Sequence, residues 1–226
     1  MKLTNVTKQS SDDKRRYADA CGLAHALELL GERWAILVLR ELMLGPRRFS
    51  DLKADLPGIS ANVLTQRLTE LEQRGLIRRT KLPPPASVQV YEATRWALDA
   101  GPILCELGRW AFRSPRHDPT QPVSAVAIML SMQTNFDPKL AGDFSAAIGF
   151  RFGDSPYFAS VEGGKIEVGP GVPARVEAMI NCSPDDLKPV LYAGAPVEDL
   201  DIKGDIEAAA RFVRLFSLPP KVEPGA

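Results

Sequence analysis

A proline and a glycine, Pro57-Gly58, interrupt two helical patterns between residues 44 and 75, and this break constrains the fold of the chain most. Proline cannot continue a helix, and glycine allows the backbone to reverse. The apolar residues before the break recur at helical spacing: Phe49, Leu52 and Leu56. After the break, Ser60 is a favourable N-cap and Gly75 offers a left-handed helix stop. The sequence therefore predicts two helices joined by a tight turn.

The second of these helices has an apolar side and an opposite side that is polar but uncharged. The apolar residues are Leu64, Leu68 and Leu71, and the residues opposite them are Asn62, Gln66, Thr69 and Gln73. Amides and hydroxyls can both donate to and accept from the base edges in a major groove. This pattern is typical of a recognition helix, although a neutral face that packs on another subunit would have the same composition.

The segment after the second helix favours DNA binding. Two short β-type runs, 76–81 and 88–91, flank Pro83-Pro84-Pro85 and predict a hairpin whose first strand is basic. Two helices followed by a basic hairpin describe a winged helix. Asn62 and Gln66 should then contact base edges, and the arginines and the lysine should contact phosphates. The predicted DNA-contacting residues are Arg47, Arg48, Ser60, Asn62, Thr65, Gln66, Arg67, Thr69, Arg78, Arg79 and Lys81.

Several motifs in this region resemble the HxlR-type family of bacterial transcriptional regulators. They are C-G-L-A-H-A-L-E-L-L-G-E-R-W, L-G-P-R-R-F-S-D-L, L-P-G-I-S, L-T-Q-R-L-T-E-L-E and G-L-I-R-R-T, and the resemblance covers about residues 18–113. It implies a winged helix-turn-helix dimer that binds an inverted-repeat operator in double-stranded DNA. It also implies that the helix with Cys21 and the helix Arg95–Phe112 form the dimer interface. Thr94-Arg95-Trp96-Ala97 departs from the family, which usually has an acidic residue and a glycine there.

The helix with Cys21 is predicted over Ala18–Leu30. Its apolar stripe is expected to be core: Leu23, Ala24, Leu27 and Leu30. Cys21 lies one turn from His25 and near the helix start, where the helix dipole favours a thiolate. Because members of the family use a cysteine in this helix to sense oxidants or electrophiles, the resemblance implies a thiol switch at Cys21. The alternative is a small buried apolar residue.

The second half of the chain begins after a proline-rich linker. We expect a flexible arm at 1–17, a DNA-binding and dimerisation domain at 18–113, a linker at 114–122 and a second domain at 123–220. A short apolar helix, strand-like runs up to residue 182 and two capped helices then follow. The fold class is therefore α+β, with a winged helix-turn-helix domain and a C-terminal α/β domain.

This C-terminal domain resembles the sterol carrier protein fold through D-P-K-L, S-P-D-D-L-K-P-V-L-Y-A-G and I-K-G-D. The resemblance implies a curved antiparallel sheet, covered by helices, over a tunnel that takes apolar molecules. Large apolar residues are the predicted lining, although each of them could also belong to an ordinary core. They are Met129, Met132, Phe144, Ile148, Phe158, Phe212 and Phe216.

The charge is divided unequally along the chain. The whole chain has 28 basic and 28 acidic residues, but residues 1–118 contain 19 basic and 14 acidic ones, so the two parts have net charges of +5 and −5. A basic DNA-binding half joined to a second function would give this asymmetry. Three widely spaced cysteines suggest a reducing cytoplasm, and without a signal peptide or an 18-residue apolar run we expect no membrane association.

The sequence also predicts that the protein is not an enzyme. The two histidines, His25 and His117, are far apart, and the GxSxG, P-loop, HExxH and GxGxxG motifs are absent. We therefore expect neither a cofactor nor a metal. The favoured function is a dimeric DNA-binding regulator that responds to an apolar small molecule or to Cys21. The alternatives are a carrier of hydrophobic ligands whose winged helix is an interaction module, and an enzyme that uses the C-terminal cavity.

Overall fold

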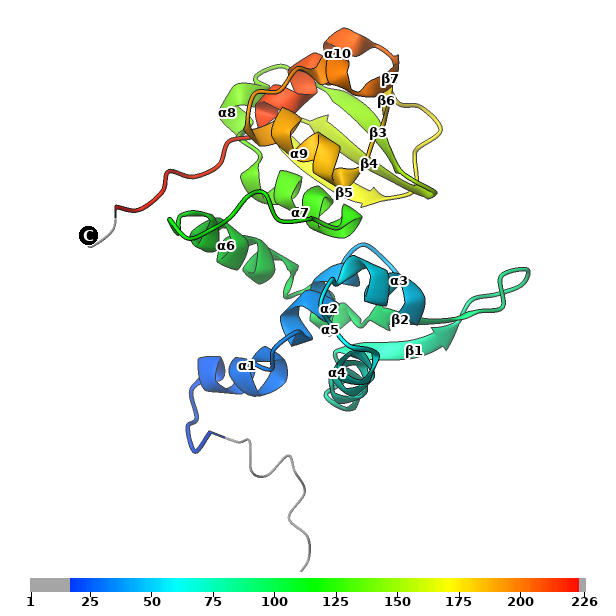
Figure 1. The fold of residues 1–226 in the computed structure, drawn as a ribbon, viewed down its shortest axis with the longest axis vertical. Helices are drawn as coiled ribbons and strands as arrows, with labels where there is room; N and C mark the ends of the chain where they lie inside the picture. The colour runs from blue at the N-terminus through cyan, green and yellow to red at the C-terminus, as the bar shows by residue number, and fades with distance from the viewer. Residues whose placement is uncertain (1–16, 224–226) are drawn as a thin grey trace, which may run out of the picture.

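The computed structural model describes residues 17–223, so the expected arm at 1–17 lies almost entirely outside the described residues. Two hydrophobic clusters are present, one within residues 35–97 and the other within residues 126–216. The two parts lie one above the other along the long axis of the molecule (Figure 1). The first part comprises α1 (Gly22–Leu30), α2 (Ala35–Glu41), α3 (Phe49–Asp55), α4 (Ala61–Gln73), β1 (Ile77–Lys81), β2 (Gln89–Ala93), α5 (Arg95–Leu98) and α6 (Gly101–Phe112).

The helix-turn-helix forms as the sequence predicts. Gly58 adopts φ +88° between α3 and α4, and Gly75 adopts φ +72° after α4, so both use backbone conformations that favour glycine. The Ser60 hydroxyl accepts a hydrogen bond from the Val63 amide at 3.2 Å and caps α4. The buried side of α4 packs into the first cluster through Leu64, Leu68 and Leu71.

The wing is a two-stranded antiparallel hairpin of β1 and β2. Arg47, just before α3, exchanges two backbone hydrogen bonds with Tyr91, with N–O distances of 2.9 and 2.8 Å. These bonds attach the start of the helix-turn-helix to the wing, so the two parts of the predicted DNA-binding surface are held in a fixed relation.

Two predictions in the first part are wrong in detail. The first helix begins at Gly22 rather than at Ala18. Of its predicted core stripe, Ala24 is buried, but Leu23 and Leu27 are 70% and 48% exposed. The predicted helix Arg95–Phe112 is interrupted at Asp99-Ala100 and forms α5 and α6. The break falls there because Pro102 has no amide hydrogen and takes a place in the first turn of α6, where none is needed.

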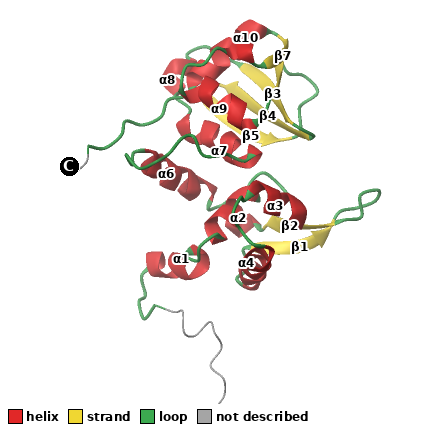
Figure 2. Cartoon of the chain, in the orientation of Figure 1, coloured by secondary structure: helices red, strands yellow, loops and turns green. Residues whose placement is uncertain are grey.

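The second part is a five-stranded sheet with helices packed against it (Figure 2). Its elements are α7 (Ala125–Asn135), α8 (Pro138–Ala141), β3 (Ala146–Phe152), β4 (Ser155–Glu162), β5 (Lys165–Pro170), β6 (Ala178–Asn181), α9 (Pro184–Tyr192), η2 (Val197–Asp199), β7 (Asp201–Gly204), α10 (Ile206–Phe212) and η3 (Val213–Leu215). The strand order is β5-β4-β3-β6-β7. Because the chain crosses from β5 to the far side of β3, β6 pairs with β3 in parallel, and the sheet is mixed rather than antiparallel as expected.

The two parts are in contact. The helices α6 and α7 lie side by side at the junction (Figure 1). The Ser124 hydroxyl donates to Glu41 Oε1 at 2.8 Å, and a guanidinium nitrogen of Arg109 donates to the Thr134 carbonyl. Arg47 Nη1 donates to the Tyr157 hydroxyl at 3.1 Å. The helix-turn-helix is therefore linked to the second part by side-chain hydrogen bonds.

Candidate nucleic-acid interface

The solvent-facing side of α4 presents a row of uncharged polar groups. Asn62, Thr65, Gln66, Thr69 and Gln73 are all exposed. The Thr65 and Thr69 hydroxyls each donate to a carbonyl one turn earlier at 2.9 Å, so their oxygens remain available as acceptors. An exposed row of acceptors and amides can read base edges in a major groove.

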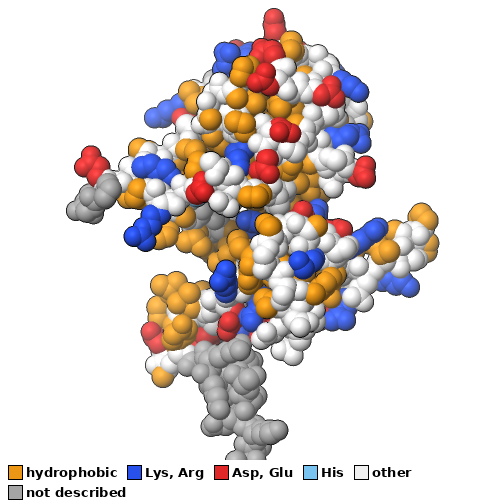
Figure 3. Space-filling model, in the orientation of Figure 1, with side chains coloured by type: hydrophobic (Ala, Val, Ile, Leu, Met, Phe, Trp, Pro, Cys, Tyr) orange, Lys and Arg blue, Asp and Glu red, His pale blue; other side chains and the backbone are white. Residues whose placement is uncertain are grey.

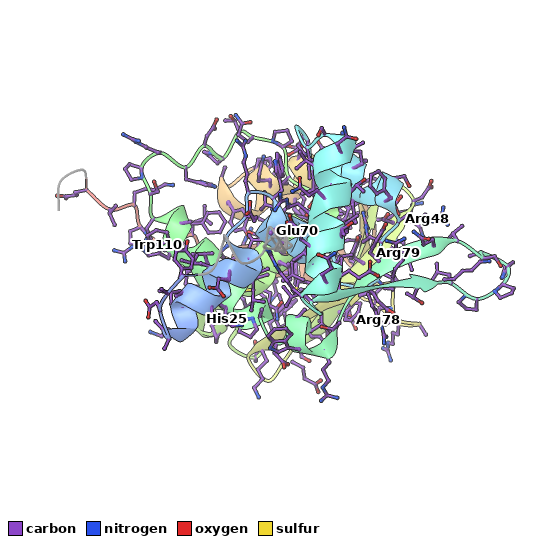
Figure 4. All side chains as sticks on the ribbon, turned by 90° about the horizontal axis from the view of Figure 1, so that it is seen from below. His25, Arg48, Glu70, Arg78, Arg79 and Trp110 are labelled. Carbon is purple, nitrogen blue, oxygen red and sulfur yellow. The ribbon has the colours of Figure 1, made fainter. Side chains whose placement is uncertain are left out.

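The acidic side chain of Glu70 lies beside this row. Gln66 Nε2 donates to Glu70 Oε1 at 3.0 Å, which orients the Gln66 amide along the helix surface. Figure 4 views the molecule from the side of α4 and shows Glu70 on this helix. Because the amide also has an oxygen and a second hydrogen, Gln66 can form further hydrogen bonds outward.

Arg67, which is predicted to contact phosphate, is directed inward in the structure. Its side chain is 8% exposed and forms ion pairs with Glu70 at 2.5 Å and with Glu32 at 3.3 Å. The side chain points under α4 because residue 67 lies on the helix face next to Leu64, Leu68 and Leu71, which are buried. The charge of Arg67 therefore serves the internal structure of the helix-turn-helix.

Arg47 is likewise directed inward rather than toward solvent. Its guanidinium forms an ion pair with Asp55 and donates to the Tyr157 hydroxyl. Burial raises the pKa of Asp55, although the charge of Arg47 opposes this shift. The charge of Arg47 therefore lies between α3 and the second part, and the DNA contact expected of it stays a prediction. Arg48, in contrast, is exposed on the same side of the molecule as the wing (Figure 4).

The wing carries three exposed cations. Arg78 Nε donates to Glu92 Oε1 at 2.7 Å, and Arg79 approaches Glu72 at 3.3 Å while its guanidinium lies 5.6 Å from the centre of the Tyr91 ring. The side chain of Lys81 has neither an ion pair nor a hydrogen bond with any other residue in 17–223. Exposed pairs of this kind contribute little to stability, so these arginines can exchange their carboxylates for phosphates.

Large apolar side chains are exposed on α1 and α6. They are Leu23, Leu27, Ile103, Leu107 and Trp110, and the last is 70% exposed. Figure 3 shows hydrophobic side chains gathered over α1, and Figure 4 shows Trp110 on the side of α4 opposite Arg48 and Arg79. An apolar surface of this kind marks an interaction site.

Cys21 lies at the N-cap position of α1 and is exposed. The nearby backbone amides of Leu23 and Ala24 lower the pKa of its thiol. The imidazole of His25 contacts Glu28 instead, with 2.9 Å between Nδ1 and Oε2. Backbone amides, rather than the predicted neighbour His25, therefore favour the thiolate. In contrast, burial raises the pKa of the Cys182 thiol to about 12.

The predicted lining of an apolar tunnel is hydrophobic core. Met129, Met132, Ile148 and Phe212 are fully buried, and Phe144 and Phe216 are nearly so. Phe158 is half-buried beside Gly169. None of the seven residues lines either of two cavities that the structure contains at the junction of the two parts. These side chains pack against one another because α10 and η3 close over the sheet. They form hydrophobic core here, and a tunnel lined by them stays a prediction.

The cavity residues were not identified from the sequence. One of the two cavities is lined by residues of α2, α6, α7 and α9 and of the segment 117–123. No pattern within one element indicates residues that meet only after five segments are packed together.

Within residues 17–223, no group of three or more histidine, cysteine or acidic side chains could hold a metal ion, and no helix is long and apolar enough to cross a membrane.

A helix-turn-helix with a basic hairpin beside its second helix defines the winged helix class. Comparison with known proteins places the chain more narrowly, because the HxlR-like helix-turn-helix family matches residues 29–118. The HTH-type transcriptional regulator YvaP of Bacillus subtilis is 37% identical over 86 residues, which is 38% of this chain and 80% of YvaP. The chain therefore belongs to the HxlR-like helix-turn-helix family.

Two further similarities concern YodB, another HTH-type transcriptional regulator of Bacillus subtilis. Its sequence is 36% identical over 86 residues, which is 38% of this chain and 77% of YodB. The solved structure of its reduced form is 32% identical, covers 44% of this chain and 100% of that chain, and has a TM-score of 0.39. The family match ends at residue 118, before α7 and the sheet of the second part.

Proposed function

We propose that this protein is a sequence-specific DNA-binding transcriptional regulator. The observation that carries the proposal is the exposed, uncharged polar face of α4, which lies beside the basic wing in a chain of the HxlR-like family. Asn62 and Gln66 read base edges, with Thr65 and Thr69 as additional acceptors and Ser60 at the helix start. Arg48, Arg78, Arg79 and Lys81 contact phosphates and fix the orientation of the protein on the duplex.

The proposed regulator is a homodimer. The exposed apolar residues of α1 and α6 supply a surface that a second copy of the chain would cover. A two-fold dimer places its two recognition helices about 34 Å apart in successive major grooves, so the operator is an inverted repeat. We propose the domain limits 18–113 and 123–220, with 114–122 as the linker.

Two kinds of control are compatible with this architecture. Oxidation or alkylation of the exposed Cys21 would place a new group beside Leu23, in the proposed dimer surface. Alternatively, an apolar small molecule would bind in the second part and shift the equilibrium toward one state of the dimer, which requires different affinities for the two states.

The proposal is tested by selecting duplexes from a random library with the full chain and measuring affinity at several salt concentrations. A regulator of this kind selects an inverted repeat, and its affinity falls steeply as salt rises because phosphate contacts release counterions. Failure to enrich any sequence, together with an affinity that is independent of salt, would refute the proposal.

A carrier of hydrophobic ligands is the second candidate function, favoured by the mostly apolar cavity at the junction. In that case the winged helix would be a protein interaction module. Such a carrier binds an apolar ligand without any selective DNA binding, so the same selection distinguishes the two functions.

A further inference from the structure

The cavity lined by α2, α6, α7 and α9 lies between the winged helix and the second part and has a volume of about 410 Å³. This volume is within the range of pockets that bind small molecules, about 300 to 1,000 Å³. Ile36 and Leu37 of α2 form one wall, and Leu104, Gly108 and Phe112 of α6 form another. The remaining walls come from α7, from α9 and from the segment 117–123.

The body of the cavity is apolar. Leu104 of α6 and Leu130 of α7 are only half-buried, although both lie at the contact between the two parts, because the cavity is next to them. Gly108 leaves further room, since a Cβ atom at this position would have no neighbour within 4 Å. An apolar molecule in this space would remove these surfaces from water, which is favourable in proportion to the area covered.

Polar groups of the lining gather where α9 meets the linker. Lys188 Nζ donates to the Gln121 carbonyl at 2.7 Å and to Asp185 Oδ1 at 3.1 Å, so one of its three hydrogens remains available. The imidazole of His117 packs edge-on against Phe112 and has no hydrogen-bond partner among the described residues. Burial, followed by the positive charge of Lys221, lowers the pKa of His117, so it is neutral at pH 7.

Besides Asp185, the cluster contains one acidic side chain of the cavity lining, Asp118, which already has hydrogen-bond partners. Asp118 accepts hydrogen bonds from the Thr120 amide, the Thr120 hydroxyl and Gln121 Nε2, and these bonds lower its pKa to about 2. One turn from Lys188 on α9, the Tyr192 hydroxyl lies 2.7 Å from the Ser131 hydroxyl. The cluster therefore offers donors from Lys188 and His117 to an incoming acceptor.

We propose that this cavity binds an apolar small molecule that carries one carboxylate, and that it is the effector site of the regulator. The carboxylate contacts Lys188 and His117, and the apolar body lies between α2, α6 and α7. The regulatory role rests on the proposed function as a DNA-binding regulator, whereas ligand binding itself does not. The site lies at the junction of the two parts, and not inside the sheet-and-helix core of the second part.

The position of the cavity explains how a ligand would affect DNA binding. The cavity-lining helix α2 packs on α4, and both helices contribute to one hydrophobic cluster, which includes Val38, Leu39, Leu64 and Leu68. A second cavity-lining helix, α6, carries the exposed Trp110 and Leu107 of the proposed dimer surface. A ligand between α2 and α7 would thus contact both the support of the recognition helix and the helix that sets the spacing of the dimer.

Isothermal titration of the full chain with decanoate tests the binding site. We expect one decanoate per chain, with at least tenfold weaker binding of decyltrimethylammonium. Lys188→Gln should weaken decanoate binding at least tenfold and 1-decanol binding less than threefold, whereas the matched variant Lys203→Gln on β7 should change neither. Binding that does not saturate, or equal losses for decanoate and 1-decanol, would overturn the assignment.

Two substitutions of different size at Gly108 test whether decanoate binds in this cavity. Gly108→Leu should fill the cavity and weaken decanoate binding at least tenfold, while Gly108→Ala should change it less than threefold. Both side chains favour a helix more than glycine does, so neither should prevent folding. In the parent chain, decanoate should slow alkylation of Cys105, which lines the cavity, at least fivefold and leave Cys21 unaffected. Unchanged Cys105 labelling and unchanged affinity in Gly108→Leu would place the ligand elsewhere.

The final arm measures affinity for a duplex selected by the parent chain. Decanoate should change this affinity at least fivefold in the parent and not in Gly108→Leu. If the chain selects a duplex but decanoate neither binds nor changes its affinity, the effector site is refuted and the regulator stands. If decanoate binds in the cavity but no duplex is selected, the ligand site stands and its regulatory role falls together with the proposed function.

Discussion

Replacement of Arg67 by methionine separates a structural role from a DNA contact. The Arg67 side chain is 8% exposed and forms ion pairs with Glu70 and Glu32. Removing one partner of a buried pair costs about 3 to 5 kcal/mol. Glu70 is 16% and Glu32 is 35% exposed, so water can partly replace the guanidinium, and methionine retains most of the apolar stem. We therefore expect a loss of about 2 kcal/mol in the free energy of unfolding.

Thermal unfolding and DNA binding together give the measurement. A loss of about 2 kcal/mol lowers the melting temperature of a chain of this size by about 4 to 8 °C. The slope of affinity against salt should stay unchanged, because a side chain that makes no phosphate contact releases no counterion. Lys81→Ala is the control, since this exposed side chain has no partner within residues 17–223, and it should reduce the slope by about one with no change in melting temperature. An Arg67→Met chain with an unchanged melting temperature and a reduced slope would refute the structural role.

Three further predictions concern the dimer surface, the exposed thiol and a buried carboxylate. Trp110→Arg should place a charge in a desolvated contact and convert the dimer to a monomer in analytical ultracentrifugation, and a variant that still sediments as a dimer would rule out α6 as the interface. Cys21→Ser should retain DNA binding after diamide treatment, whereas the parent and Cys182→Ser should lose it; equal loss in all three would exclude the thiol switch. Burial raises the pKa of the Glu41 carboxyl above its usual 4.5, although the charge of Arg40 opposes the shift. The folded chain therefore holds the Glu41 proton more tightly than the unfolded chain does. The stability gained from this proton is fully present below pH 4.5 and is lost as the pH rises through the raised pKa. The melting temperature of the parent minus that of Glu41→Gln should therefore increase as the pH falls from 7 to 4.5, and a constant difference would contradict this account.

The helix-turn-helix could be predicted because its signals are local. Ser60, Pro57-Gly58 and Gly75 each fix the backbone within a few residues, and the structure has α4 with the predicted cap and stop. The helical periodicity also predicts which face of α4 points outward. It does not predict the inward direction of Arg67, because Glu32, one of the ion-pair partners of Arg67, lies in the loop after α1 and comes close only in the folded chain.

The features that could not be predicted depend on long-range packing. The periodicity of α1 identified an apolar stripe but not what covers it, and Leu23 and Leu27 are exposed in the single chain. The parallel pairing of β3 with β6 depends on a crossover that no local motif specifies. The position of Arg47 just before α3 predicts a DNA contact. In the structure, the Arg47 guanidinium donates to the hydroxyl of Tyr157, a residue more than a hundred positions away in the sequence.

Base reading by α4 is the central claim, and the affinity of Gln66→Ala for two duplexes tests it most directly. One duplex is selected by the parent chain and the other has a random sequence of the same length. Loss of one base contact costs about 1 to 3 kcal/mol, so the variant should bind the selected duplex about 5-fold to 150-fold more weakly. Its affinity for the random duplex should not change, because Gln66 makes no phosphate contact in this account. Equal losses on the two duplexes would contradict the assignment of α4 as the recognition helix.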